Sequence, residues 1–175
     1  MIKYRNTYEE TGEVVIISCY NKIGNITGKI IIDKDDFDKV KCYQWHVENS
    51  RPSIKYAQAS ISKGTIRLHK LIMSSNLQID HINHNGLDNR KCNLRVCTNA
   101  ENNRNKDFKR NPLSGHRGIR YNPKTQSYYV RIMVNKKEIS LGAYKTIEDA
   151  IKARIRGEEK YFGNFRYKEI NAQIN

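Results

Sequence analysis

The stretch from residue 79 to residue 103 places an acid, Asp80, directly before a histidine, His81, and ends in a segment rich in asparagine. Carboxylate and amide oxygens are hard donors, which favour Mg²⁺ or Mn²⁺ over Zn²⁺. Histidine titrates near neutral pH, so it can take a proton from an attacking water molecule. These residue types suit hydrolysis of a phosphodiester bond assisted by one metal ion. An isolated Asp-His pair is more often only part of a loop, so the surrounding elements must decide.

Those elements are predicted to be two strands joined by a long turn and followed by a helix. Residues 79–82 and 93–98 flank an Asn- and Gly-rich connection and should pair with each other. Thr98 and Glu101 have the spacing of a capping box, whose side chains bond the free N–H groups at a helix start. A helix should therefore begin at Asn99.

The first turn of that helix carries Asn102, which should point back towards the two strands. Asn103 and Asn105 are rivals for the same role, but their directions on the helix suit it less well. Asp80 and His81 present a geometric difficulty, because neighbouring side chains of a regular strand point to opposite faces. Both can act on one phosphate only if the strand ends or bulges there.

Residues 68–105 resemble the HNH nuclease family with its ββα-metal finger, and they look most like the phage and intron-encoded branch of that family. The resemblance implies that Asp80 is a metal ligand and that His81 is the general base. It also implies that Asn93 holds the long turn in shape and that Asn102 is the second ligand of a Mg²⁺ or Mn²⁺ ion. Many family members have histidine at that last position, and asparagine favours the homing branch.

Other polar residues of this stretch have less certain roles. His84 and Asp88 fit turn positions better than ligand positions. His69 stands where this branch often has histidine, and it could contact phosphate or brace the finger. Arg90 and Arg95 flank the site, where they could bind phosphate or simply form a solvated strand face.

The N-terminal residues 1–66 are predicted to form a β-rich platform, with Trp45 as an anchor of its core. β-Branched residues and turn formers indicate strands at 14–20 and 29–33 and a short helical turn at 33–41. The run 65–73 should begin as a strand and continue as a short helix. The platform therefore leads directly into the candidate site.

Residues 107–115 are polar and basic and are predicted to be a linker, in which Lys109 and Arg110 would contact the DNA backbone. Beyond it the pattern changes to three strands, at 116–121, 127–134 and 137–144. Thr146 and Asp149 then form a capping box for a helix that ends at Gly163. Its apolar stripe should consist of Ile147, Ala150, Ile151, Ile155 and Phe162.

Residues 115–166 resemble the plant ethylene-response-factor (Apetala-type) DNA-binding domain, in which a three-stranded sheet enters the major groove and a helix packs behind it. Arg117 and Arg120 match the family's Arg-Gly-x-Arg contact positions, although alternation would place them on opposite faces. Tyr129 and Arg131 should point outward from the sheet. Tyr129 and Ser140 depart from common residues of the plant proteins, which weakens any transfer of sequence preference.

Composition narrows the class of partner. The chain has 175 residues, with 32 Lys and Arg against 18 Asp and Glu, and a formal net charge of +14. A polyanionic partner is the natural inference. No segment is long and apolar enough to cross a membrane, and the N-terminus does not read as a signal peptide. The four cysteines form no C-x-x-C pair and are expected to be reduced thiols of a cytoplasmic protein in a bacterial host cell, one that a phage could encode.

Taken together, the sequence predicts an α+β protein with an N-terminal β-rich region, a central ββα-metal finger and a C-terminal three-stranded antiparallel sheet packed on one helix. The expected boundaries are an HNH nuclease domain at 1–106 (platform 1–66, metal core 67–106), an Apetala-type domain at 116–167 and a tail at 168–175. The expected function is that of a monomeric homing-type endonuclease acting on double-stranded DNA. A DNA-binding regulator with an inactive HNH site is the alternative, and an RNA-binding protein fits the charge but not the sheet module.

Overall fold

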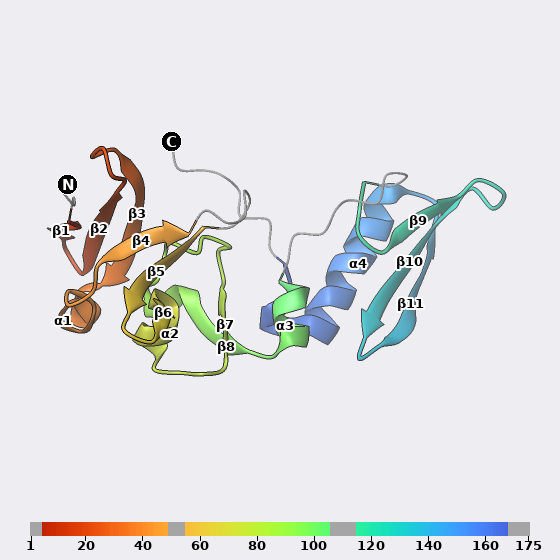
Figure 1. Ribbon diagram of the computed structural model, residues 1–175. Coiled ribbons are helices and arrows are strands. Elements are labelled where there is room, and N and C mark those ends of the chain that lie inside the picture. The colour runs from red at the N-terminus through yellow and green to blue at the C-terminus, as the bar shows by residue number, and fades with distance from the viewer. Residues whose placement is uncertain (1–4, 49–54, 106–114, 168–175) are drawn as a thin grey trace. The chain divides into compact units, whose positions relative to one another are not determined.

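The computed structural model describes residues 5–48, 55–105 and 115–167 of the chain (Figure 1). The chain divides into two compact units, Met1–Asn99 and Ala100–Asn175. The predicted linker, with Lys109 and Arg110, lies almost wholly outside the described residues, and the predicted tail lies wholly outside them. Among the described helices, none is long and apolar enough to cross a lipid bilayer.

The first unit begins with an antiparallel sheet of β1 (Thr7–Thr11), β2 (Val14–Tyr20) and β3 (Ile26–Asp33), in that order. Alternate residues of β2 are buried, as expected for a strand with one face on the core. A 3-10 turn, η1 (Lys34–Asp36), and a one-turn helix, α1 (Phe37–Val40), follow β3. The strands and the helical turn predicted for this region are confirmed.

A second sheet contains β4 (Trp45–Glu48), β5 (Tyr56–Ile61) and β6 (Gly64–Arg67), and it leads into α2 (Leu68–Met73). The predicted change from strand to helix within 65–73 is confirmed. Trp45 is fully buried, and its indole nitrogen donates a hydrogen bond to the carbonyl oxygen of Val40 at 3.0 Å. Trp45 therefore anchors the core of this unit, as its position in the sequence predicts.

The third part of the first unit is a hairpin of β7 (Gln78–His81) and β8 (Leu94–Cys97), with η2 (Lys91–Asn93) in the connection. The connection joins the edge of β3: the Ile31 amide donates to the Leu87 carbonyl at 2.9 Å, and the Asn89 amide donates to the Ile31 carbonyl at 2.7 Å. Leu87 and Leu94 belong to the same buried core as Trp45. Platform and hairpin thus form one packed body.

The second unit contains a three-stranded antiparallel sheet with the order β11-β10-β9, formed by β9 (Ile119–Asn122), β10 (Ser127–Val134) and β11 (Lys137–Tyr144). The helix α4 (Ile147–Phe162) packs on this sheet, and η3 (Gly163–Phe165) follows it. The first strand starts three residues later than predicted, because Gly118 has a φ of +70° and forms a turn before it. The described residues therefore combine sheets with few helices, as expected for the α+β class.

The start of α4 follows the predicted capping chemistry, but its buried face differs from the prediction. The Thr146 side chain accepts a hydrogen bond from the Asp149 amide at 3.2 Å. Ile155 is 40% exposed, so its place in the apolar stripe was wrong. The buried positions are Ala150, Ala153, Arg154, Gly157 and Phe162. Small residues occupy this face because the helix lies close to the sheet: Leu141 fills the space that a side chain at Gly157 would need.

The short helix α3 (Asn99–Arg104) begins at Asn99, as the Thr98 and Glu101 pattern predicts. From Ala100 onward its residues belong to the second unit. The four cysteines are free thiols, and Cys92 lies in η2 rather than in a strand.

Gly118 provides a test of the entry into the second sheet. An added Cβ would press on the carbonyl oxygen of Arg131, whose amide donates to the Gly118 carbonyl at 2.9 Å. Gly115 is the matched control: its φ is +68°, yet no described atom lies within 4 Å of an added Cβ. Gly115→Ala should cost about 1–2 kcal/mol of unfolding free energy, and Gly118→Ala about 1–3 kcal/mol more. Chemical denaturation measures both variants, and equal costs would show that the contact with Arg131 plays no part.

Candidate active site

The candidate acid and base occupy the last two positions of β7. Asp80 pairs with Arg95 of β8, and His81 pairs with Leu94, in an unbroken antiparallel register. Both side chains are nearly buried, with Asp80 7% and His81 5% exposed. The strand ends at His81, which is one of the two arrangements that the sequence required. Because the ladder has no bulge, the two side chains have different neighbours.

Asp80 forms an ion pair with the arginine opposite it. Nε and Nη2 of Arg95 lie 2.9 Å and 2.6 Å from Oδ2 of Asp80. The side chain of Arg95 is mostly buried, so solvent screens this pair less than a surface pair. Arg95 is therefore not a solvated strand face, and any cation on Asp80 would share the carboxylate with this guanidinium.

His81 lies among aromatic rings and one amide. Its Nε2 is 3.4 Å from Oδ1 of Asn89, and its ring centroid is 5.8 Å from that of Tyr56 and 5.1 Å from that of His69. Burial lowers the pKa of His81, although the Asn89 contact and the nearby carboxylates of the aspartates in this region oppose the shift. The imidazole is consequently neutral near neutral pH, which is the form that accepts a proton.

His69 is part of the same cluster but has a different environment. It lies on α2, is 4% exposed, and its Nδ1 has no hydrogen-bond partner among the described residues. Burial, reinforced by His81 and by the cations Arg67 and Lys70, lowers the pKa of His69 from its ordinary value of 6.5 to about 3. His69 therefore packs against the candidate base as a neutral ring. Of its two predicted roles, this position favours bracing over phosphate contact.

The long turn between β7 and β8 is closed by Asn93. Its Oδ1 accepts a hydrogen bond from the Asn83 amide at 2.9 Å, and its Nδ2 donates to the Asp88 carbonyl at 2.7 Å. The Asn93 carbonyl also accepts from the Ile82 amide at 2.9 Å. One buried side chain thus links the beginning and the end of the turn.

Asp88 and His84 occupy turn positions. His84 has a φ of +61°, and Asp88 is buried. Nε and Nη2 of Arg90 contact the two carboxylate oxygens of Asp88 at 2.8 Å and 2.7 Å. Burial alone would raise the pKa of Asp88, but the hydrogen bonds and charge of Arg90 outweigh it and keep that pKa below its usual value. Arg90 is thus engaged within the turn.

The second proposed ligand comes from the other unit. Asn102 is half-buried on α3, whereas Asp80 belongs to the first unit. Within the described residues, His, Cys, Asp and Glu form no group of three or more suited to a metal ion. A carboxylate and an amide are nevertheless the hard oxygen donors that Mg²⁺ and Mn²⁺ accept, and a two-ligand site leaves positions for phosphate and water. The donor types therefore fit such an ion.

The exposed face of the second sheet carries three of the predicted DNA-contacting residues. Arg120, Tyr129 and Arg131 are exposed and line one shallow groove with Lys124. Nη1 of Arg131 lies 2.9 Å from Oε2 of Glu138 across the sheet. The alternation predicted for β10 places these side chains away from α4, and their burial pattern agrees with it.

Arg117 differs from these three residues. It is half-buried, and burial together with the neighbouring charge of Arg154 lowers its pKa, whereas Glu158 raises it. Both of those neighbours lie on α4, on the opposite side of the sheet from the groove. Arg117 lies in the turn before β9 and not on a strand, so the alternation that would place Arg117 and Arg120 on opposite faces does not apply to it.

Sequence reasoning missed Asn89 and Tyr56. Asn89 is fully buried, its Oδ1 approaches the candidate base, and its Nδ2 donates to the Gly86 carbonyl at 3.4 Å. The turn contains several asparagines, so composition offered no way to select this one. Tyr56 lies on a strand of the platform, far from the site in sequence. Only the folded chain brings its ring to His69 and His81.

Comparison with known proteins locates the similarity in this region. Residues 73–104 match the model of an HNH endonuclease family. The chain is 28% identical over 142 residues to a protein of Acanthamoeba polyphaga mimivirus named "uncharacterized HNH endonuclease L560", a match that covers 77% of this chain and 71% of that protein. No solved structure matches the chain significantly. The family match covers the hairpin and α3 and indicates a nuclease.

The low pKa of His69 has a consequence for stability. Between pH 6.5 and about 3 the unfolded chain binds a proton at this position and the folded chain does not. The contribution of His69 to stability is therefore complete above pH 6.5 and is lost as the pH falls towards 3. His69→Phe, which keeps a ring and cannot titrate, should lose less unfolding free energy over this range than the wild type does. Denaturant titrations at several pH values measure the two slopes, and identical slopes would contradict the neutral buried state.

Proposed function

We propose that this chain is a homing-type HNH endonuclease that hydrolyses phosphodiester bonds of double-stranded DNA with one Mg²⁺ or Mn²⁺ ion. The observation that carries the proposal is the position of His81, which is buried at the end of β7, directly after Asp80 and inside the stretch that matches the HNH family. The net charge of +14 supports a polyanionic substrate.

In this proposal His81 is the general base. A neutral imidazole accepts the proton of the attacking water molecule, and its orientation matters because proton transfer needs hydrogen-bond distance. Asn89 contacts Nε2, and the rings of His69 and Tyr56 restrict rotation of the imidazole. Attack at phosphorus then releases a 3′-hydroxyl and leaves a 5′-phosphate. Asn93 contributes by keeping the turn closed around this end of the strand.

Asp80 and Asn102 would hold the metal ion, and we propose that α3 completes a ββα-metal finger with β7 and β8. β8 ends at Cys97 and α3 begins at Asn99, so the two elements follow each other directly in the chain, as such a finger requires. When bound, the ion would supply positive charge to the scissile phosphate and the leaving oxygen.

The second unit would select the DNA site. Its three-stranded sheet with a helix on one side supports the Apetala-type resemblance, and the open face presents Arg120, Tyr129 and Arg131. Arginine contacts guanine through two parallel hydrogen bonds in the major groove, which gives direct sequence readout. Arg117, which lies in the turn before β9 and outside that groove, would contact the DNA backbone rather than a base.

A second candidate function is DNA binding without cleavage, as in a regulator. The ion pair between Asp80 and Arg95 favours it, because the guanidinium already neutralises the carboxylate that should hold the metal ion. Cleavage assays separate the two functions.

His81→Ala should lower the rate of DNA cleavage by about 10²–10⁴-fold, because a positioned general base contributes an acceleration of that order. Binding of duplex DNA should remain, since His81 is buried and contributes little contact surface. Nicking of supercoiled plasmid in Mg²⁺ or Mn²⁺, together with a gel-shift assay, measures both properties.

His46→Ala is the matched control, because His46 is a half-buried histidine on β4 of the same unit and has no proposed role. His46→Ala should still cleave DNA. EDTA, which removes the divalent ions, should abolish cleavage by the wild type. A wild-type protein that binds DNA but never cuts it in either metal would establish the regulator instead.

Arg120→Ala should relax sequence preference at one base pair by about 1–3 kcal/mol, the discrimination of one bidentate arginine contact. Arg156→Ala removes the same charge from an exposed position on α4. It should weaken binding to all DNA sequences slightly and equally. Selection of bound or cleaved sites from randomised DNA reports both effects. If Arg120→Ala keeps the wild-type sequence preference, the sheet does not take part in base recognition.

A further inference from the structure

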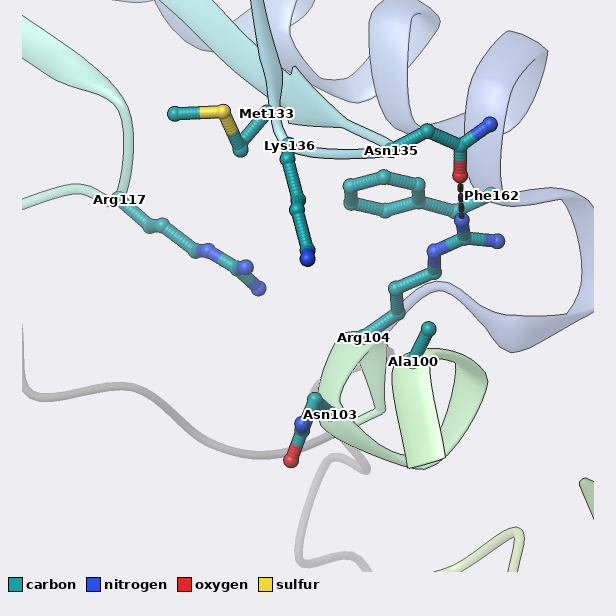
Figure 2. A pocket seen from close by; sticks show the side chains of 8 residues that line it. All are labelled: Ala100, Asn103, Arg104, Arg117, Met133, Asn135, Lys136 and Phe162. Atoms are coloured by element: carbon teal, nitrogen blue, oxygen red, sulfur yellow. Dashed lines mark hydrogen bonds between the residues drawn. The ribbon is translucent and has the colours of Figure 1, made fainter. Parts of the chain in front are cut away.

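The second unit contains a pocket that is separate from the groove on the sheet (Figure 2). Its volume is about 450 Å³, and its lining residues come from α3, from the turn before β9, from the end of β10 and the turn that follows it, and from the end of α4. Three of them are cations, Arg104, Arg117 and Lys136, and none is acidic. The rest of the lining consists of Ala100, Asn103, Met133, Asn135 and Phe162.

The cations of this pocket share one space. Figure 2 shows the charged ends of Arg117 and Lys136 directed towards the same hollow. Glu158 raises the pKa of Arg117, and its carboxylate also lies 2.8 Å from Nε of Arg154. Positively charged groups that line one hollow attract an anion.

The guanidinium of Arg104 is held in place before any ligand binds, and a tight turn fixes the backbone of Lys136. The guanidinium carbon of Arg104 lies 5.1 Å from the centroid of the Phe162 ring, and its Nη2 donates to Oδ1 of Asn135 at 3.4 Å. Asn135 and Lys136 form the tight connection between β10 and β11, with φ values of +48° and +65°. Preorganised groups lose less conformational freedom on binding, which favours affinity.

We propose that this pocket binds a phosphate group of the DNA backbone and is a second DNA contact, distinct from the groove lined by Arg120, Tyr129 and Arg131. This inference rests on the proposed function, namely that the chain binds duplex DNA. Arginine and lysine are the usual partners of backbone phosphates, and amides such as those of Asn103 and Asn135 add hydrogen bonds. The apolar side chains of Met133 and Phe162 suit contact with the adjacent deoxyribose.

The residues that line the pocket lie on or beside elements that have roles in the proposed function. Asn103 and Arg104 line it, and they follow Asn102, the proposed metal ligand, on α3. Lys136 lies in the turn that joins β10 and β11, two strands of the sheet that we propose reads the DNA. A phosphate bound here would therefore immobilise the ligand-bearing helix and the reading sheet at the same time.

The test compares two neighbouring lysines in the full chain, with EDTA present so that DNA is bound but not cut. Lys136→Ala removes a lining charge, and Lys137→Ala removes the same charge from the next residue, which is exposed and outside the pocket. Affinity for duplex DNA is measured as a function of salt concentration. Lys136→Ala should bind about 3–10-fold more weakly, and its log–log salt slope should fall by about 0.9, the loss of one phosphate contact. Lys137→Ala should keep the wild-type slope, and Lys136→Arg should restore it.

Because Lys136 has a positive φ, Lys136→Asn is a second variant that removes the charge and tolerates this backbone conformation. If Lys136→Ala, Lys136→Asn and Lys137→Ala still bind DNA and have equal salt slopes, the pocket does not bind the DNA backbone. The proposed function would not be contradicted by that result. A wild-type chain that binds no duplex DNA would instead contradict the proposed function itself.

A third arm uses inorganic phosphate as the probe, with thermal unfolding as the readout. If phosphate stabilises the wild type but not Lys136→Ala, while the DNA salt slopes stay equal, the pocket takes a free anion and the assignment to the DNA backbone is wrong.

Discussion

The candidate active site depends on the closure of the turn between β7 and β8 by one buried amide. Asn93 has both a donor and an acceptor, and it uses them on the Asp88 carbonyl and the Asn83 amide. A hydrophobic residue here would leave the buried Asp88 carbonyl without this partner, at a cost of about 1–3 kcal/mol, and would also remove the hydrogen bond of the half-buried Asn83 amide. With the turn closed, its middle can join the edge of β3, where Ile31 exchanges hydrogen bonds with Leu87 and Asn89. That contact places Asn89 beside His81.

Electrostatics within the first unit is arranged around neutral imidazoles and paired carboxylates. His69 and His81 lie edge to face with centroids 5.1 Å apart, and burial lowers the pKa of each. Asp80 and Asp88 are each held by an arginine close in space. A buried charge without a partner would be costly, so these pairs allow acids to remain in a nearly closed site. A metal ion that binds Asp80 must therefore compete with Arg95 for the carboxylate.

The second unit divides its basic residues between two surfaces. Arg120 and Arg131 belong to the open face of the sheet, whereas Arg117 turns towards α4 and the pocket lined by Lys136 and Arg104. A base contact and a backbone contact have different requirements, since bases are read by geometry and phosphates mainly by charge. The open face of the sheet therefore suits selection of the DNA site, and the pocket suits binding of the DNA backbone.

Local patterns in the sequence determined most of the elements. The two strands around the Asn-rich turn, the helix start after Thr98 and the capped helix after Thr146 all follow from spacings of a few residues, because capping and strand alternation are short-range effects. Residue type drew attention to Asp80 and His81, and the resemblance to HNH nucleases added Asn93. Tertiary structure decided what each of them contacts. The Arg95 pair on Asp80, the Asn89 contact with His81 and the ring of Tyr56 beside His81 depend on register and packing between distant segments. Ile155 was placed wrongly for the same reason: periodicity identifies a helical face, but the closeness of α4 to its sheet decides which side chains fit beneath it.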